Sequence, residues 1–259
     1  MTKIKVFLDP GHGGTDRYNK GPTGYIEADG VLDISLKLRD ELLSTGAFEV
    51  KMSREKDATV GVRERGNMAA QWKADMFISE HSNATGWKVN NTKRGVDVFY
   101  SVDIPSDKDF ANRMSKEIAD VMDTNNNGGY TWESKNYPGE DYLGVIDAAQ
   151  DGGVKHVLLI ENGFHDNAQD EAVLKDPAKR TAIAKAQARI ICNFYGVQYP
   201  VVKKEEPDMW KKNIVKEAFE LGLITDQAWV DKADEEATVW FVLAVAINLF
   251  KKLIYKLLI

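Results

Sequence analysis

The chain has 259 residues, 43% of them hydrophobic, with a formal net charge of −6 at pH 7 and an isoelectric point near 5.4. This length is sufficient for one sizeable core and a small second unit, and the acidic balance argues against a nucleic-acid-binding protein, which usually carries a basic face. A single cysteine, Cys192, excludes an intrachain disulfide framework and a cysteine-rich zinc finger.

Hydrophobic periodicity predicts alternating strands and helices over residues 1–197. The expected strands are 4–8, 48–54, 76–81, 95–100 and 156–161. The expected helices are 31–46, 62–73, 110–121 and a segment around 183–194, while 124–141 is expected to be a loop. This alternation indicates an α/β fold, with a twisted, mostly parallel or mixed sheet and helices on both faces.

A Pro- and charge-rich linker is expected at 198–208, followed by a small α-helical domain over 209–259. Residues 235–257 predict one long apolar helix or two, and their apolar run is too short to span a membrane by itself. Three alternatives stay open for this helix: burial within the chain, pairing with a second copy as a homodimer, and adsorption on a membrane surface.

Polar residues with metal-binding or proton-transfer chemistry end three of the predicted strands. His12, His81 and Glu161 occupy these positions, and Glu27 precedes a predicted helix, where a carboxylate is favoured. Ligand sites of open α/β sheets lie at the carboxyl ends of the strands. Two histidines and a carboxylate form a catalytic zinc set with one open position, and a second carboxylate can move protons. The residue types alone leave open which glutamate is the ligand and which is the base.

Four motifs carry a resemblance to a known family: DPGHGG at 9–14, Glu27 before a helix, ADMFISEHSNA at 74–84 and VLLIENGF at 157–164. In order and spacing, over residues 3–195, they resemble the zinc-dependent N-acetylmuramoyl-L-alanine amidases of the type-3 family. The resemblance implies that Zn²⁺ is bound by His12, Glu27 and His81, and that Glu161 is the catalytic acid/base. It also implies cleavage of the amide between the lactyl group of N-acetylmuramic acid and L-alanine of the stem peptide.

The chain departs from the family pattern at two places, and further residues are candidates for contact with substrate. Glu80 stands before the second histidine, where the family usually has an apolar residue, and GFHDN at 163–167 replaces the commoner GFLSN. We expect Asn83 and His165 to bind substrate, and the loops 15–26 and 124–141 to wall the cleft. Arg54 and Arg65 are expected to be structural ion-pair partners.

The resemblance also implies the partners and the place of action. Peptidoglycan is the expected partner, with no nucleic acid, and 209–259 loosely resembles one S-layer-homology-like repeat, which implies cell-wall binding through a secondary cell-wall polymer. Residues 2–8 indicate a strand, not a signal peptide. We therefore expect a phage-type endolysin, synthesised in the host cytoplasm and acting on the cell wall after release, with a bacterial autolysin or spore lysin as the alternative.

Three other functions are alternatives to the amidase function. A zinc peptidase acting on stem peptides or cross-links would use the same metal set and differ only in its product. A wall-binding protein without activity is disfavoured, since all four presumed functional residues are present. A nucleotide-binding protein is the weakest alternative, because the glycine-rich turn lacks the Lys-Ser/Thr of a phosphate-binding loop.

Overall fold

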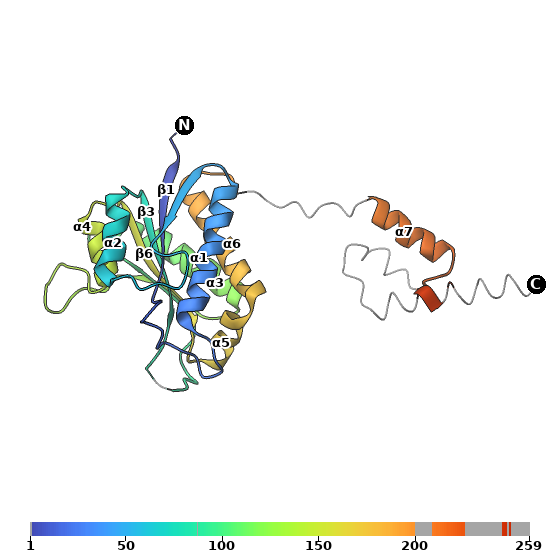
Figure 1. Cartoon of the computed structure of the whole chain (residues 1–259), viewed down its shortest axis with the longest axis horizontal. Coiled ribbons are helices and arrows are strands. Elements are labelled where there is room, and N and C mark those ends of the chain that lie inside the picture. Colours follow the sequence, from blue (N-terminus) through green and yellow to red (C-terminus); the bar gives the residue numbers. More distant parts are fainter. Residues whose placement is uncertain (1, 87, 200–208, 226–244, 248, 250–259) are drawn as a thin grey trace, which may run out of the picture. The chain divides into compact units, whose positions relative to one another are not determined.

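The computed structural model describes residues 2–86, 88–199, 209–225, 245–247 and 249 (Figure 1). The chain divides into two compact units at Tyr199, and each unit is described by itself. The first unit carries the alternating strands and helices that hydrophobic periodicity predicts.

A six-stranded sheet forms the centre of the first unit, in the order β2-β1-β3-β6-β4-β5. Its strands are β1 (Ile4–Pro10), β2 (Phe48–Met52), β3 (Met76–Asn83), β4 (Val96–Tyr100), β5 (Asn126–Tyr130) and β6 (His156–Phe164). Strands β2, β1, β3 and β6 are parallel, whereas β4 is antiparallel to β6 and parallel to β5. The predicted α/β class with a mixed sheet is therefore confirmed.

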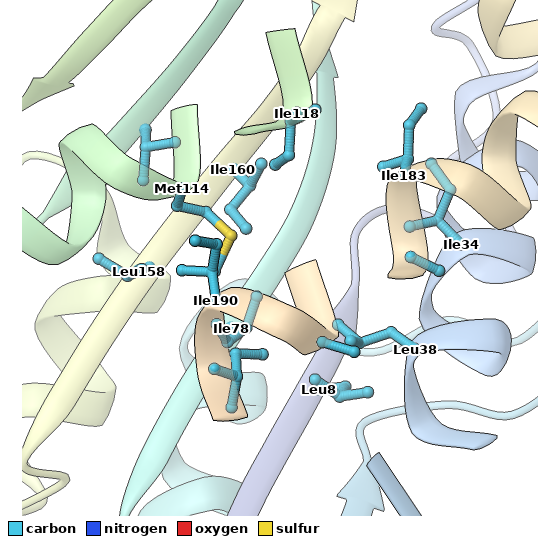
Figure 2. Packing of buried hydrophobic residues seen from close by; sticks show 14 of the residues in the cluster. Leu8, Ile34, Leu38, Ile78, Met114, Ile118, Leu158, Ile160, Ile183 and Ile190 are labelled. Carbon is cyan, nitrogen blue, oxygen red and sulfur yellow. The ribbon is translucent and has the colours of Figure 1, made fainter. Parts of the chain in front are cut away.

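Helices cover both faces of this sheet (Figure 1). One face packs against α1 (Glu27–Ser44), α3 (Lys108–Met122) and α6 (Pro177–Phe194), and the other against α2 (Val62–Gln71) and α4 (Gly144–Asp151). Successive strand residues point to opposite faces, so Leu8 joins the first cluster and Phe7 the second. Figure 2 shows Leu8 and Ile78 among side chains of the first cluster, each contributing about 1.5–3 kcal/mol by burial.

The prediction of a loop over 124–141 is wrong at its start, because Asn126–Tyr130 forms the edge strand β5. Glycines disfavour strands, so Gly128 and Gly129 masked this element in the sequence. A Cβ at Gly129 would lie 2.6 Å from Cβ of Ala111, so the glycine lets β5 approach α3 closely. The sequence also missed two eight-residue helices, α4 and α5 (Ala168–Lys175), which are too short to show a clear helical period.

In the second unit, α7 (Met209–Glu220) is a helix, as the pattern predicted. The expected linker lies outside the described residues from 200 onward, and so does most of the apolar helix expected at 235–257. Within the described part of the chain, no helix is both long enough and apolar enough to cross a membrane.

Candidate active site

The turn that follows β1 holds His12 in a left-handed backbone conformation. The angle φ is 57° at His12, 111° at Gly13 and 60° at Gly14. Glycine adopts such angles readily, whereas a non-glycine residue does so where its surroundings fix the backbone. A Cβ on Gly11 would lie 2.3 Å from Cε1 of His81, so this glycine allows β1 to pass directly beside the second imidazole.

Two buried arginines hold this turn in place. Arg65 forms an ion pair with Asp9, with 2.8 Å between Nη1 and Oδ1, and its Nη2 donates to the carbonyl oxygen of His12 at 2.9 Å. Arg54 donates from Nε to the carbonyl oxygen of Pro10 at 2.9 Å. Burial and the neighbouring charge of Arg65 lower the pKa of Arg54 to about 10. Arg65 is thus the structural ion-pair partner that was predicted, whereas Arg54 makes its hydrogen bonds to backbone carbonyls.

The structure brings His12, Glu27 and His81 together at the carboxyl ends of β1 and β3. Nε2 of His12 lies 3.4 Å from Oε2 of Glu27, and Nδ1 of His81 lies 3.2 Å from Oε1. The two imidazole centroids are 4.9 Å apart. Each of the three residues offers a ligand atom within 4.8 Å of the other two, which is close enough for one metal ion to contact all three.

The contacts of Glu27 determine the protonation states of this cluster. Glu27 is the first residue of α1, is 1% exposed, and accepts the backbone N–H of Ser82 at 2.9 Å. Burial raises the pKa of Glu27, but hydrogen bonds from His12 and His81 outweigh burial and lower it far below its usual range. Burial lowers the pKa of His12, but Glu27 and Asp16 reverse this and raise it to about 9. The metal-free cluster therefore pairs a carboxylate with a protonated imidazole.

This donor set fits zinc. Two imidazoles and one carboxylate, with a fourth position left for water, are a known catalytic zinc set. Nδ1 of His12 lies 2.8 Å from Oδ2 of Asp16, and such a carboxylate contact fixes the imidazole that binds a metal through its other nitrogen. The anionic Glu27 is buried between the imidazoles, where a cation offsets the cost of its burial.

Glu161 lies on β6, directly beside His81 in the parallel register of β3 and β6. Its Oε2 is buried and has no hydrogen-bond partner among the described residues. Burial, and then the charges of Glu27 and Asp97, raise the pKa of Glu161 well above its usual value. These surroundings favour the protonated form of the Glu161 carboxyl, and they include the charge of Glu27 in the cluster.

Sequence reasoning missed Asp97 and Tyr130, which line the side of Glu161 away from His81. Asp97 is the antiparallel partner of Glu161, and its carboxylate accepts from the Tyr130 hydroxyl and from Nδ2 of Asn83, the latter at 3.0 Å. With Asn83, they line a pocket of about 510 Å³. The signal in the sequence is the carboxylate within the apolar strand GVDVFY, but the sequence does not show which strand pairs with it.

His165 lies behind the metal cluster. His165 is 3% exposed. Its Nδ1 lies 3.0 Å from Oγ of Ser82 and 3.9 Å from Oε2 of Glu27. Its contacts are with residues that hold Glu27, and its contact with substrate stays a prediction.

Comparison with known proteins gives the family. The profile described as N-acetylmuramoyl-L-alanine amidase matches residues 6–193. N-acetylmuramoyl-L-alanine amidase CwlM of Bacillus licheniformis is 33% identical over 195 residues, which cover 75% of this chain and 70% of that protein. The endolysin of Bacillus phage SPP1 is 28% identical over 207 residues, 76% of this chain and 68% of that one. LytC of Bacillus subtilis (strain 168) is longer, and the chain spans 33% of it.

A solved structure agrees with this. The catalytic domain of CwlV, an N-acetylmuramoyl-L-alanine amidase from Bacillus (Paenibacillus) polymyxa, superposes with a TM-score of 0.64 at 25% identity, covering 75% of this chain and 99% of that domain. The chain therefore belongs to the N-acetylmuramoyl-L-alanine amidase family and has the fold of these enzymes.

Proposed function

We propose that the chain hydrolyses the amide bond between the lactyl group of N-acetylmuramic acid and L-alanine of the stem peptide, with Zn²⁺ as its cofactor. One observation carries the proposal: His12, Glu27 and His81 converge beside Glu161, whose buried carboxyl has a free oxygen. Membership of the amidase family supports the choice of bond.

His12, Glu27 and His81 would hold the zinc ion. When bound, zinc makes water acidic enough to ionise near neutral pH and polarises a carbonyl group. Asp16 keeps His12 oriented through Nδ1, and Ser82 and His165 keep Glu27 oriented from behind. The chain thus contributes three ligands whose side chains are held in place by neighbouring residues.

Glu161 would move the proton in both halves of the reaction. Its ionised carboxylate accepts one proton from the attacking water at Oε2 as the new C–O bond forms. The resulting carboxylic acid then donates that proton to the nitrogen of L-alanine as the C–N bond breaks. Burial and the charge of Asp97 favour the protonated form, which is the form required for departure of the amine. Asn83 lines the pocket that also contains Asp97, and it would contact the substrate there.

The partners and the place of action follow from the same proposal. Peptidoglycan is the substrate, and residues 209–259 would bind a secondary cell-wall polymer or a second copy of the chain. The similarity to an endolysin of Bacillus phage SPP1 supports a protein made in the host cytoplasm that acts on the wall after release.

The test is digestion of purified peptidoglycan by the wild type, by Glu161→Gln and by Glu49→Gln, a control at an exposed glutamate of β2. Products are identified by mass spectrometry and zinc is measured in each protein. We expect the wild type and Glu49→Gln to release stem peptides with L-alanine at the amino terminus, and Glu161→Gln to retain zinc without activity. Cuts within the stem peptides would favour the zinc-peptidase alternative, and a zinc-free wild type without activity would contradict the proposal.

A further inference from the structure

A segment between β5 and α4, residues 131–143, carries a stack of aromatic rings. Its two arms are held together by the N–H of Tyr142, which donates to the carbonyl oxygen of Trp132 at 2.7 Å. The rings of these two residues are stacked, with 4.4 Å between centroids and 21° between planes. Asp141 fastens the segment to the sheet, because its carboxylate accepts the hydroxyl of Ser101 at 2.6 Å. The stack is therefore a fixed structure on an ordered segment.

The stack begins in the core and ends in solvent. Phe99, a buried residue of β4, lies 5.6 Å from Trp132 between ring centroids. Trp132 is 44% exposed, Tyr142 is 56% exposed and nearby Tyr137 is 70% exposed. One face of the Tyr142 ring rests on Trp132, so its exposed surface lies on the outer side of the stack. Grouped aromatic surface of this kind marks a binding site more often than isolated exposed residues do.

This exposed surface adjoins the active site. Trp132, Tyr137 and Tyr142 line a pocket of about 840 Å³ between the segment 131–143 and helices α2 and α4. In Figure 1 the segment is the yellow-green loop that projects beyond these two helices. Trp132 also lines the pocket of about 510 Å³ that contains Asn83 and Asp97, next to Glu161. A polymer that enters the active site can therefore extend over Trp132 into the larger pocket.

The charges of the larger pocket restrict what it accepts. Its lining includes the carboxylates Glu140, Asp141, Asp147 and Asp151, but only two cations, Arg63 and Lys135. Arg63 already pairs with Asp147 and Asp151, so these acids are not a free cation site. Carboxylates repel anionic groups and accept hydrogen bonds from hydroxyl and amide groups. Flat aromatic rings beside hydrogen-bond acceptors suit the apolar face and the polar edge of a sugar ring.

We propose that the Trp132–Tyr142 stack is a subsite for an N-acetylated amino sugar of the glycan strand, next to the muramic acid whose amide is cleaved. The proposal rests on the proposed function, because it takes the glycan strand to be the polymer that crosses the active site. The outer face of Tyr142 packs against the sugar ring, and Trp132 supports Tyr142 from behind.

The direct test measures binding of chitotetraose, a neutral chain of four N-acetylglucosamine units, by titration calorimetry with the full chain. We expect Tyr142→Ser to weaken binding by about five- to tenfold, and Tyr142→Phe, which keeps the ring, to bind as the wild type does. Thermal unfolding of both variants checks that they are folded. Absence of chitotetraose binding by the wild type, or equal binding by folded Tyr142→Ser, would overturn the subsite.

A second measurement separates this proposal from the function on which it rests. Turnover is compared on polymeric peptidoglycan and on a single N-acetylmuramoyl peptide that is too short to reach Tyr142. We expect Tyr142→Ser to raise KM for the polymer several-fold and to leave turnover of the short substrate unchanged. An equal loss on both substrates would place the effect in the active site and overturn the subsite. If the wild type cleaves neither substrate, the proposed function fails while the chitotetraose result still stands.

Discussion

Asp97 and Glu161 lie opposite one another in the antiparallel register of β4 and β6, so two carboxyl groups share one side of the cleft. The charge of Asp97 adds to burial and to the charge of Glu27 in raising the pKa of Glu161. Asp97 itself is tied by hydrogen bonds from Asn83 and Tyr130, which keeps its charge at a fixed position. The charge of Asp97 therefore helps to keep the pKa of Glu161, the proposed proton-transfer group, above its usual value.

Replacing Asp97 by asparagine is expected to lower the pKa of Glu161, because a negative charge beside it is removed. The acidic limb of the pH profile of kcat/KM reports ionisation of the base in the free enzyme, so it should move to lower pH by roughly one unit. Asp103→Asn, at an exposed aspartate six residues further along the chain, should leave the profile unchanged. An unshifted limb in Asp97→Asn would show that Asp97 does not act on Glu161.

Zinc binding should depend on pH because His12 must lose its proton before it can be a ligand. Its pKa is raised to about 9 by Glu27 and Asp16 against the effect of burial, so protons compete with zinc below that pH. We expect zinc affinity to rise about tenfold per pH unit up to about pH 9 and then to level off. Asp16→Asn removes part of the raising effect, so its affinity should level off at lower pH. Competition titrations with a zinc chelator measure this, and a pH-independent affinity in the wild type would contradict it.

Glu80 should make stability depend on pH. Burial, set against hydrogen bonds from Asn162 and Gln187, raises its pKa from 4.5 to about 7. A carboxyl whose folded pKa is raised stabilises the fold below its unfolded pKa, and that contribution is lost as pH rises through the folded value. The wild type should therefore lose about 3 kcal/mol relative to Glu80→Gln between pH 4.5 and pH 8.

Urea unfolding at both pH values measures this difference. Glu49→Gln, at an exposed glutamate on β2, should follow the wild type. Parallel curves for the wild type and Glu80→Gln would mean that Glu80 ionises as freely in the folded chain as in the unfolded one.

Gly11→Ala tests the close approach of β1 to His81. The added methyl group would lie 2.3 Å from Cε1 of the imidazole, so the ring must move away from Glu27. We expect zinc affinity to fall at least about tenfold and turnover about a hundredfold. Gly144→Ala is the matched control, because its methyl group would meet Cγ1 of Val62 at 3.5 Å, an ordinary contact. Normal zinc affinity in Gly11→Ala would show that the turn can yield.

Much of the sheet could be predicted from the sequence, because its strands are apolar runs between turn residues. The same runs predicted strand ends at His81 and Glu161, but β3 continues to Asn83 and β6 to Phe164. The structure does bring His12, Glu27 and His81 together, with Glu161 beside His81. The strand β5 could not be predicted, since Gly128 and Gly129 have poor strand propensity. Gly129 is required there by the close approach to α3, and Gly128 adopts a φ of 94°. At such a position the packing against α3, and not the strand propensity of the residue, determines which residue is present.

The residues that surround the candidate ligands were harder to find. Ser82 and Asp97 act on partners that lie far away in the sequence, Glu27 and Glu161, and such contacts leave no periodic signal. His165 was singled out because it follows the late motif, but the structure places it behind Glu27 and not at the exposed side. The pairing of strands decides which side chains surround the candidate ligands, and a single sequence does not reveal that pairing.

The position of β6 has a consequence for how the chain is made. It is the last strand among the residues that the structure describes, yet it lies between β3 and β4 at the centre of the sheet. A ribosome that has released only the residues before β6 leaves the facing edges of β3 and β4 without a partner, and unpaired edges invite association with other chains. Since β6 also carries Glu161, the nascent chain lacks the proposed proton-transfer group until this strand has emerged and inserted. Activity should therefore appear late and abruptly during synthesis, and the step that completes the sheet also completes the enzyme.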